Sequence, residues 1–355
     1  MDGGPTRLPT TRTEKPRYAD MLLSHPPGPG QEPAMTTRNP VFPSFLLLLC
    51  LASYSPSAAS QNDTLQHGDR QWSPTVARPE FPQGEGPIVL VDAAHGNFHT
   101  INGRFAAFAD LLKADGYRVQ SAEGQVTRSL LGEADVFVIS NAVDGGDDAE
   151  WVLPTPSAFT PEEIEALAAW VEEGGSLLLI ADHMPFPGAA ADLANRFGIV
   201  FYNGYALRGL RQGGALVFTR GTGALADHAI TRGRSDSEAI GSVKSFTGQA
   251  FRPVTGVQPL MYMPEDWKVL FPSEAGAFDE GTPRVSARGL IQSCVLRFGA
   301  GRVAVFGEAA MFTAQTWVQD GIVGRMGLND PEAGENAQFV LNLMHWLTGL
   351  LDEQS

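Results

Sequence analysis

The strongest constraint on the fold is an alternation of short apolar runs with helix-period segments, which continues through the chain after its first 85 residues. Residues 88–91 (IVLV) and 176–181 (SLLLIA) read as strands that are apolar on both faces, as in a parallel sheet covered by helices. Between them a helix is predicted over 161–173, where Thr160 can cap and Glu163 completes a capping box. Strands that alternate with helices indicate an α/β fold with a mainly parallel sheet and helices on both faces.

The remaining elements follow from the same two periodicities. Further strands are predicted at 117–120, 136–139 and 243–251, helices at 105–112, 190–197 and 336–347, and a hairpin that pairs 285–298 with 301–306. Gly116 closes the helix at 105–112, because glycine tolerates the left-handed conformation of a helix end. The hairpin, at residues 285–306, would lie in the C-terminal part of the domain. The chain has no internal repeat.

The N-terminal region is predicted to carry an export signal. Residues 45–52 (FLLLLCLA) are followed by small residues up to Ala59, which is typical of a signal peptide that starts at Met35. The run is too short to cross a bilayer, which takes about 20 residues. A lipid anchor at Cys50 is the alternative, and Leu49 argues against it, since lipidation requires a small residue there.

The predicted organisation follows from this signal. We expect 1–34 to be disordered or a mis-called upstream extension, 35–59 a signal peptide, 60–84 a polar linker, and 85–350 the α/β domain. The mature protein would be periplasmic or secreted, with no stable membrane insertion after cleavage. Its oligomeric state stays open, homo-oligomers included.

The charge and cysteine content exclude several classes of function. The chain has 25 basic and 40 acidic side chains, for a net charge of −15, and no dense cluster of Lys and Arg. Nucleic acid is therefore not expected as a partner, because phosphate backbones are bound by such clusters. Two cysteines, Cys50 and Cys294, are too few for a disulfide framework or a thiolate metal cluster.

Polar side chains follow four of the predicted strands. Asp92 and His95 come after the first strand, Ser140 and Asn141 after 136–139, Asp182 and His183 after 176–181, and Glu308 after the second arm of the hairpin. Because the carboxyl ends of parallel strands meet at one edge of a sheet, these side chains are predicted to share a crevice. The candidate catalytic residues are His95, Asp182, His183 and Glu308, and the candidate ligand-binding residues are Asp92, Asn97, His99 and Asn141.

Two chemistries fit these residue types. His95, His99, Asp182 and His183 could bind a divalent metal such as Zn²⁺, which lowers the pKa of a bound water to about 7 for hydrolysis. Without a metal, His95 or His183 could act as a general base, with Asp92, Asp182 or Glu308 setting its tautomer. A third interpretation is structural, in which His99 orients its loop and Asp182 with His183 forms a hydrogen-bonded turn. Spacing alone does not choose between them.

Nucleophilic and nucleotide chemistry have little support. No Gly-x-Ser-x-Gly or Gly-x-Cys-x-Gly elbow follows a predicted strand, and no phosphate-binding loop or dinucleotide fingerprint occurs. Cys294 lies in a strand-like run, where a thiol is usually a small buried hydrophobe. His345, in the last helix, is expected to have a satisfied structural role.

Three segments resemble a known superfamily. Residues 175–183, 227–233 (DHAITRG) and 301–312 (GRVAVFGEAAMF), in that order, are similar to the class I glutamine amidotransferase-like superfamily. Within it, they look most like the ThuA-like (trehalose utilisation) proteins and the related domain of gliding-motility transport accessory and intraflagellar-transport proteins. Those relatives carry Asp-His-Pro-Ile-Thr-x-Gly, and Ala229 stands here in place of the proline.

The resemblance implies a flavodoxin-like layered fold. True amidotransferases place a cysteine after the strand that ends here in Ala181, and this chain has Asp182 and His183 there, so glutamine hydrolysis by that mechanism is not expected. His183 stands where ThuA-like members, which are linked to sugar metabolism, have a histidine. Asp227 and His228 would form a structural corner.

The sequence therefore predicts an exported amidotransferase-like domain that lacks the cysteine nucleophile. Its crevice would bind a small polar ligand, with carbohydrate as the expected class, and support hydrolase or isomerase chemistry with or without a metal. The alternative is a non-catalytic ligand-binding or protein-interaction scaffold.

Overall fold

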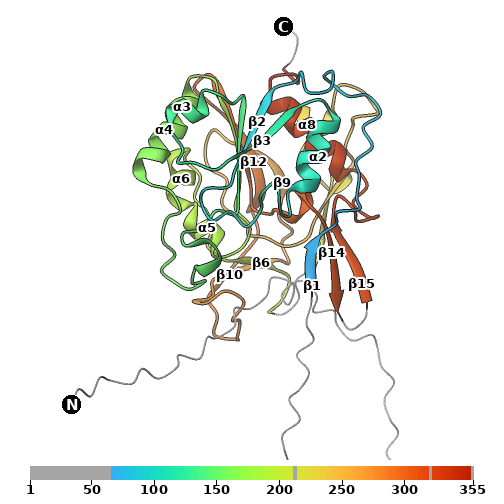
Figure 1. The fold of residues 1–355 in the computed structure, drawn as a ribbon. Coiled ribbons are helices and arrows are strands. Elements are labelled where there is room, and N and C mark those ends of the chain that lie inside the picture. The colour runs from blue at the N-terminus through green and yellow to red at the C-terminus, as the bar shows by residue number, and fades with distance from the viewer. Residues whose placement is uncertain (1–64, 211–213, 320–321, 353–355) are drawn as a thin grey trace, which may run out of the picture.

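A seven-stranded sheet forms the centre of the computed structural model, which describes residues 65–210, 214–319 and 322–352 (Figure 1). Its strand order is β3-β2-β4-β5-β13-β12-β9. Five neighbouring strands are parallel, namely β3 (Arg118–Ala122), β2 (Ile88–Asp92), β4 (Val136–Ser140), β5 (Ser176–Ile180) and β13 (Gly301–Phe306), and the antiparallel strands β12 (Ile291–Phe298) and β9 (Gln258–Tyr262) complete the sheet. This mixed, mainly parallel sheet confirms the predicted α/β class.

Helices cover both faces of the sheet. One face carries α2 (Ala106–Ala114) and α8 (Asn336–Leu347), and the other carries α3 (Arg128–Leu131), α4 (Pro161–Glu172), α5 (Phe186–Ala189) and α6 (Ala191–Arg196). Successive side chains of a strand point to opposite faces. Leu178 and Ile180 of β5 therefore lie in one apolar core, and Leu177 and Leu179 lie in the other. This double burial explains the uninterrupted apolar run of β5.

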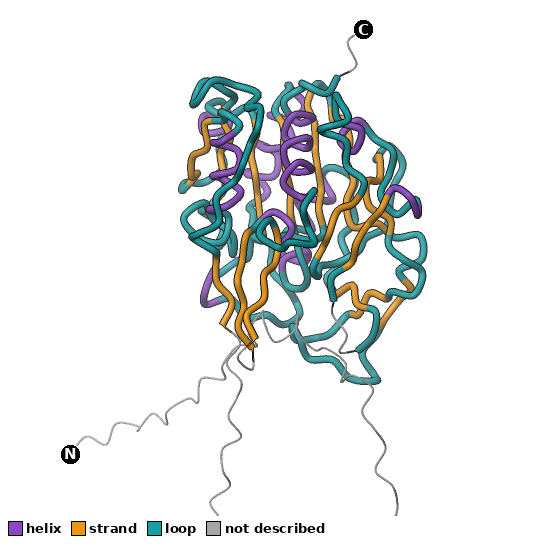
Figure 2. Tube along the Cα trace, turned by 90° about the vertical axis from the view of Figure 1, so that its right-hand side faces the viewer, coloured by secondary structure: helices purple, strands orange, loops and turns teal. Residues whose placement is uncertain are grey.

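Smaller sheets surround this centre. They comprise the antiparallel set β1 (Leu65–Gly68), β14 (Ala314–Gln319) and β15 (Ile322–Gly327), the antiparallel set β6 (Tyr205–Leu207), β10 (Lys268–Leu270) and β11 (Arg284–Ser286), and the pair β7 (Leu216–Thr219) and β8 (Ser242–Ser245). The chain also contains the short helices η1 (Gly146–Asp148), η2 (Arg220–Thr222), α7 (Ala229–Arg232) and η3 (Ala310–Phe312). Figures 1 and 2 show the β1-β14-β15 sheet at the end of the molecule away from the described C-terminus.

The best-predicted elements are two helices with strong local signals. Helix α4 has both bonds of the predicted capping box: Thr160 Oγ1 accepts from Glu163 N, and the Glu163 carboxylate accepts from Thr160 N. Helix α8 spans the predicted residues, from Asn336 to Leu347. In the described part of the chain, no helix combines the length and hydrophobicity that crossing a bilayer requires.

Several predicted boundaries differ from the structure. Residues 65–68, within the predicted linker, form β1, which pairs with β14, so the described fold begins before the predicted start near Gly86. The predicted hairpin is confirmed between β12 and β13, but residues 284–286 form β11, which pairs with β10 in a different sheet. Strand pairing between distant segments decides such boundaries, and local sequence patterns do not record it.

Other differences concern shorter elements. The strand predicted over 243–251 is confirmed only through Ser245. The helix predicted over 190–197 is confirmed as α6, and the additional short helix α5 directly precedes it, where a loop was expected. The predicted upstream extension, the signal peptide and the first residues of the linker lie outside the described residues.

Candidate functional site

The predicted site residues lie along one edge of the sheet. Strands β2, β4, β5 and β13 are neighbours in this order and run in the same direction. Asp92 ends β2, Ser140 ends β4, and Asp182 and Glu308 each follow two residues after the ends of β5 and β13. The expected convergence of polar groups at the carboxyl ends of the strands is thus observed. The structure divides these groups into two sets with different surroundings.

The first set, called the His95 clamp, consists of Asp92, His95 and Glu163. His95 Nδ1 lies 2.9 Å from both carboxylate oxygens of Asp92, and its Nε2 lies 3.0 Å from Glu163 Oε1. The ring also packs on Phe159, with 4.5 Å between ring centroids. Burial opposes protonation of His95, but the hydrogen bonds and charges of Asp92 and Glu163 outweigh it and raise the pKa of the imidazole.

Glu163 was not among the predicted site residues. It comes from the first turn of α4, where the sequence indicated a capping role, and that role is present. Its Oε1 also accepts from Val126 N at 3.0 Å while it faces His95. Burial opposes ionisation, but backbone donors at Thr160 and Val126 and the His95 ring outweigh it, so the pKa of Glu163 is lowered. Only a contact between distant segments could have revealed this second role.

The His95 clamp uses both nitrogens of the imidazole. A base or a metal ligand needs a free lone pair on one of them, and here each nitrogen faces a carboxylate. Asn97 is engaged in the same loop, because its Oδ1 accepts from His95 N at 3.0 Å and its Nδ2 donates to the Ser140 carbonyl. In this conformation Asp92, His95 and Asn97 therefore hold the loop after β2 in place.

The second set, called the buried cluster, consists of His99, Asn141, Asp182, His183 and Glu308, each no more than 1% exposed. Asn141 Oδ1 accepts from Asp182 N at 2.9 Å, and Asp182 Oδ1 accepts from His183 N at 2.8 Å and from Thr247 Oγ1 at 3.3 Å. These bonds connect the ends of β4 and β5 into one network. The cluster thus combines two carboxyl groups, two imidazoles and an amide, all of them shielded from solvent.

Glu308 is the most perturbed acid of the buried cluster. Its Oε1 and Oε2 accept from the backbone N–H groups of Ala310 and Met311 at 2.8 and 2.9 Å. Burial and then the negative charge of Asp182 raise the pKa of Glu308 well above its usual range, against the opposing effect of those backbone donors. Glu308 therefore keeps its proton to a higher pH than an exposed glutamate does.

The two imidazoles of the buried cluster are neutral for a common reason. Burial lowers the pKa of His183, and it lowers that of His99 well below the usual range, where the charge of Arg104 adds to the effect. His183 Nδ1 donates to the Met184 carbonyl at 2.8 Å, which leaves the lone pair on Nε2. The ring of His183 stacks on Tyr205 of β6, with 4.5 Å between centroids.

His99 and Asn141 offer polar atoms without a partner among the described residues. His99 Nδ1 lies 3.2 Å from Ser140 Oγ and its ring stacks on Phe105, while its Nε2 has no such partner. Asn141 Nδ2 also has none. Asn141 is, in addition, the one non-glycine residue of the described chain with a positive φ, at 51°. Strained backbone of this kind is common at functional sites.

The predicted metal set is divided between the two groups. His95 belongs to the His95 clamp, and His99, Asp182 and His183 belong to the buried cluster. Over residues 65–210, 214–319 and 322–352, no three side chains of His, Cys, Asp or Glu are arranged to hold a metal ion. Zn²⁺ binding therefore stays a prediction.

Three other residues have the structural roles expected of them. Cys294 is buried on β12, and burial raises the pKa of its thiol to about 12. His228 caps α7, since its Nδ1 accepts from Ile230 N at 3.1 Å. His345 Nε2 lies 2.8 Å from the buried carboxylate of Asp115, at the opposite end of the sheet from the site.

Comparison with known proteins adds a likeness of fold. No model of a protein family matches this chain, and no curated protein sequence matches it. Among solved structures, the mmIFT52 N-terminal domain matches with a TM-score of 0.51 and 16% identity, over 73% of this chain and 97% of that domain. This likeness shows the fold and says nothing about activity.

Two further solved structures are described as ThuA-like. The protein from Bacteroides uniformis matches with a TM-score of 0.41 and 12% identity, over 78% of this chain and 94% of that one. The protein from Parabacteroides merdae matches with a TM-score of 0.41 and 10% identity, over 76% and 93%. The match to the mmIFT52 N-terminal domain confirms, at the level of fold, the resemblance to the intraflagellar-transport group.

Proposed function

We propose that this chain is an exported, ThuA-like domain with flavodoxin-like layering, whose buried cluster binds a small polar ligand of the carbohydrate class. Numbered along the chain, the five parallel strands have the order 2-1-3-4-5, and this order supports the layering. The apolar run at 45–52 supports export to the periplasm or the medium. The resemblance to ThuA-like proteins, which are linked to sugar metabolism, supports the ligand class.

The observation that carries the proposal is the opposite tuning of two groups, Glu308 and His183, that both feel the charge of Asp182. The raised pKa of Glu308 favours its protonated form, whereas the lowered pKa of His183 favours its neutral form, with the ring proton on Nδ1. Titratable groups whose surroundings shift their pKa values in this way can serve as acid and base. We infer that the buried cluster can supply both a proton donor and a proton acceptor.

This pair supports hydrolysis or isomerisation. In a hydrolysis, His183 Nε2 would take a proton from the attacking water, and Glu308 would give its proton to the oxygen that leaves. In an isomerisation, the same groups would remove a proton from one atom of the sugar and return one to another. Asn141 Nδ2 and His99 Nε2 would hold the hydroxyl or carbonyl oxygens of the ligand, because both atoms lack a partner among the described residues.

A divalent metal stays part of the proposal. Zn²⁺ would rely on the imidazole and carboxylate groups of the buried cluster, since both nitrogens of His95 already face carboxylates. When bound, such an ion would make hydroxide available from water near neutral pH. Elemental analysis of protein purified without a histidine tag, before and after chelation, tests this part. A stoichiometric metal would support it, and none in the untreated protein would remove it.

A non-catalytic scaffold is the second candidate function. It is favoured by the burial of the buried cluster, whose five side chains are at most 1% exposed and partly satisfy one another. In that case the cluster would stabilise the edge of the sheet and have no turnover. A ligand would also need the covering loops to move before it could reach Glu308.

Replacement of His183 by Asn separates the two functions. Asn can keep the donor to the Met184 carbonyl while it removes the Nε2 lone pair. The matched control is His228→Asn, which can keep the acceptor for Ile230 N on α7, outside the site. We would measure binding and turnover of a panel of aryl glycosides and reducing sugars by calorimetry and NMR.

The acid–base proposal expects turnover of at least one panel member. General acid–base catalysis contributes about 10²- to 10⁴-fold, so His183→Asn should lose at least about 100-fold in turnover and stay folded, while His228→Asn keeps the wild-type rate. Absence of binding to every sugar, together with a large loss of melting temperature in His183→Asn, would instead support the scaffold.

A further inference from the structure

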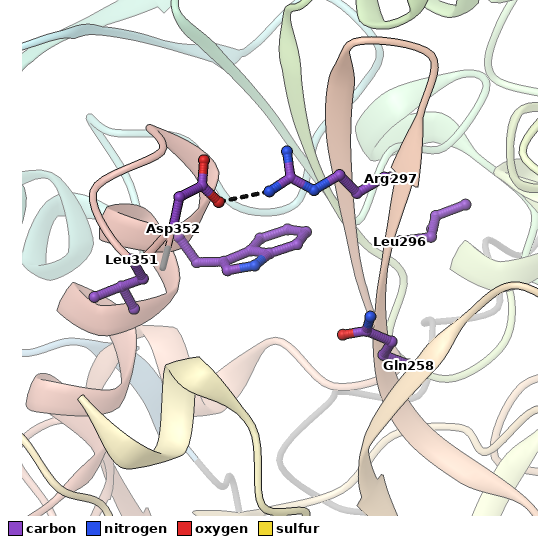
Figure 3. A pocket seen from close by; sticks show the side chains of 6 residues that line it. Gln258, Leu296, Arg297, Leu351 and Asp352 are labelled. Atoms are coloured by element: carbon purple, nitrogen blue, oxygen red, sulfur yellow. Dashed lines mark hydrogen bonds and ion pairs between the residues drawn. The ribbon is translucent and has the colours of Figure 1, made fainter. Parts of the chain in front are cut away.

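A cavity lies at the opposite end of the sheet from the buried cluster. It has a volume of about 420 Å³ and is lined by Gln258, Leu296, Arg297, Trp346, Leu351 and Asp352. Figure 3 shows Arg297 and Gln258 on one side and Leu351 and Asp352 on the other, while the side chain of Leu296 points away from the space between them. We call this cavity the C-terminal groove.

The pairing of β12 with β13 shows how far the C-terminal groove lies from the buried cluster. Arg297 pairs with Arg302 near the start of β13, and Glu308 follows the other end of that strand. Six residues of extended chain span about 20 Å. The C-terminal groove is therefore separate from the proposed sugar site.

Positive charge exceeds negative charge around the C-terminal groove. Asp352 accepts from Arg297 Nη2 at 2.5 Å and also from Arg302, so two guanidinium groups share one carboxylate. Burial opposes ionisation of Asp352, but the bonds and charges of Arg302 and Arg297 outweigh it and lower its pKa. Arg297 uses one of its five N–H donors in this pair, so it can offer others to a ligand.

The orientation of the Gln258 amide follows from a chain of hydrogen bonds. Ile230 N donates to His228 Nδ1 at 3.1 Å, so the proton of the neutral ring is on Nε2. His228 Nε2 then donates to Gln258 Oε1 at 2.8 Å. The oxygen of this amide is therefore engaged, and its NH₂ group is the part that can donate into the groove.

The remaining lining combines another donor with apolar surface. The indole N–H of Trp346 can only donate, and the ring of Trp346 is held by Arg302, whose guanidinium carbon lies 5.4 Å from the ring centroid. Leu351 and the ring of Trp346 supply apolar surface. An amide, a guanidinium and an indole are thus N–H donors beside this apolar surface, which suits a ligand with a negative, acceptor-rich end and an apolar body.

We propose that the C-terminal groove binds a small carboxylate-bearing molecule. The carboxylate accepts hydrogen bonds from Arg297 and Gln258, and the body of the molecule lies against Trp346 and Leu351. The planar guanidinium suits this partner because its N–H groups match the two oxygens of a carboxylate.

Two matched pairs of probes test the proposal on the full chain by titration calorimetry. Cyclohexanecarboxylate is compared with cyclohexanecarboxamide, and glucuronate with glucose, so that each pair differs mainly in the carboxylate. We expect the carboxylate of at least one pair to bind at least tenfold more tightly than its neutral partner. A preference in the second pair alone would indicate a sugar acid, and one in the first pair alone an apolar acid. Equal binding within both pairs, or none, would overturn the proposal.

Two variants assign the binding to this place. Arg297→Gln should weaken carboxylate binding about tenfold or more, whereas Arg208→Gln, in an exposed ion pair with Asp266, should leave it unchanged. Gln258→Glu keeps an acceptor for His228 but adds a negative charge to the groove, so it should abolish binding. Unchanged binding in both groove variants would overturn the assignment. His183→Asn should leave carboxylate binding intact, which separates this inference from the sugar site.

Discussion

Glu163 Oε1 lies 3.0 Å from His95 Nε2 across 68 residues of sequence, and this contact joins the first turn of α4 to the loop after β2. The same carboxylate accepts from Thr160 N and Val126 N. One side chain therefore caps a helix, fixes a second loop and holds an imidazole. The loop that it holds also carries His99 into the buried cluster, so the His95 clamp supports the proposed site from outside it.

The first prediction concerns the stability that Glu163 supplies. Glu163→Gln should lower the free energy of unfolding by about 1–3 kcal/mol, because a buried charged hydrogen bond to His95 is lost. Glu162→Gln is the matched control, since Glu162 occupies the same turn but is exposed, and it should change stability by about 0.5 kcal/mol or less. Urea unfolding measures both. Equal effects would mean that the His95 contact contributes nothing.

The second prediction concerns the pH dependence of the His95 clamp. The folded pKa of His95 is raised, so the folded state holds its proton more tightly than the unfolded state. Its contribution is fully present below the unfolded pKa of about 6.5 and is lost as pH rises through the folded value.

The difference between wild type and His95→Asn isolates this effect from the other histidines. The melting temperature advantage of wild type should be larger at pH 6 than at pH 9, as measured by circular dichroism. An advantage that grows with pH would contradict the raised pKa.

The third prediction concerns the Asp182 and Glu308 pair. Asp182→Asn removes a neighbouring negative charge, so the pKa of Glu308 should fall while staying above its usual range, because burial remains the larger cause. NMR titration of ¹³C-labelled glutamate carboxyl groups, with Glu308→Gln to assign the signal, would measure the change. An unchanged pKa would show that Asp182 does not act on Glu308.

The fourth prediction separates ligand binding from folding at His99. The double variant His99→Phe with Ser140→Ala removes a buried hydrogen bond together with the unpartnered Nε2, and it retains a ring next to Phe105. Replacing both partners of a buried bond by apolar groups is close to neutral, so the free energy of unfolding should change by about 1 kcal/mol or less.

Sugar binding should nevertheless be lost in this double variant, because His99 Nε2 is one of the two proposed contacts to the ligand. Calorimetry with the best sugar of the panel checks this outcome. Full binding by a folded double variant would exclude His99 from the site.

The elements that could be predicted are those whose signals are local. The capping box of Thr160 and Glu163, the apolar stripe of α8 and the double-faced run of β5 each depend on residues a few positions apart. Strand β1 could not be predicted, because its four residues (LQHG) have no strand pattern of their own and form a strand by pairing with β14 about 250 positions later. Likewise, residues 284–286 lie at the start of the predicted hairpin but form strand β11, which pairs with β10 in another sheet.

The predicted site shows the same difference between what local sequence patterns reveal and what contacts between distant segments decide. The amino-acid sequence by itself determined that acids and imidazoles would meet at the carboxyl edge of a parallel sheet, because strand direction and the polar residues after each strand are readable locally. Only the tertiary structure decided that His95 is held by two carboxylates while His183 and Glu308 are buried with opposite proton preferences. The physical reason is that a pKa depends on burial and on neighbouring charges, and these come from segments brought together by folding.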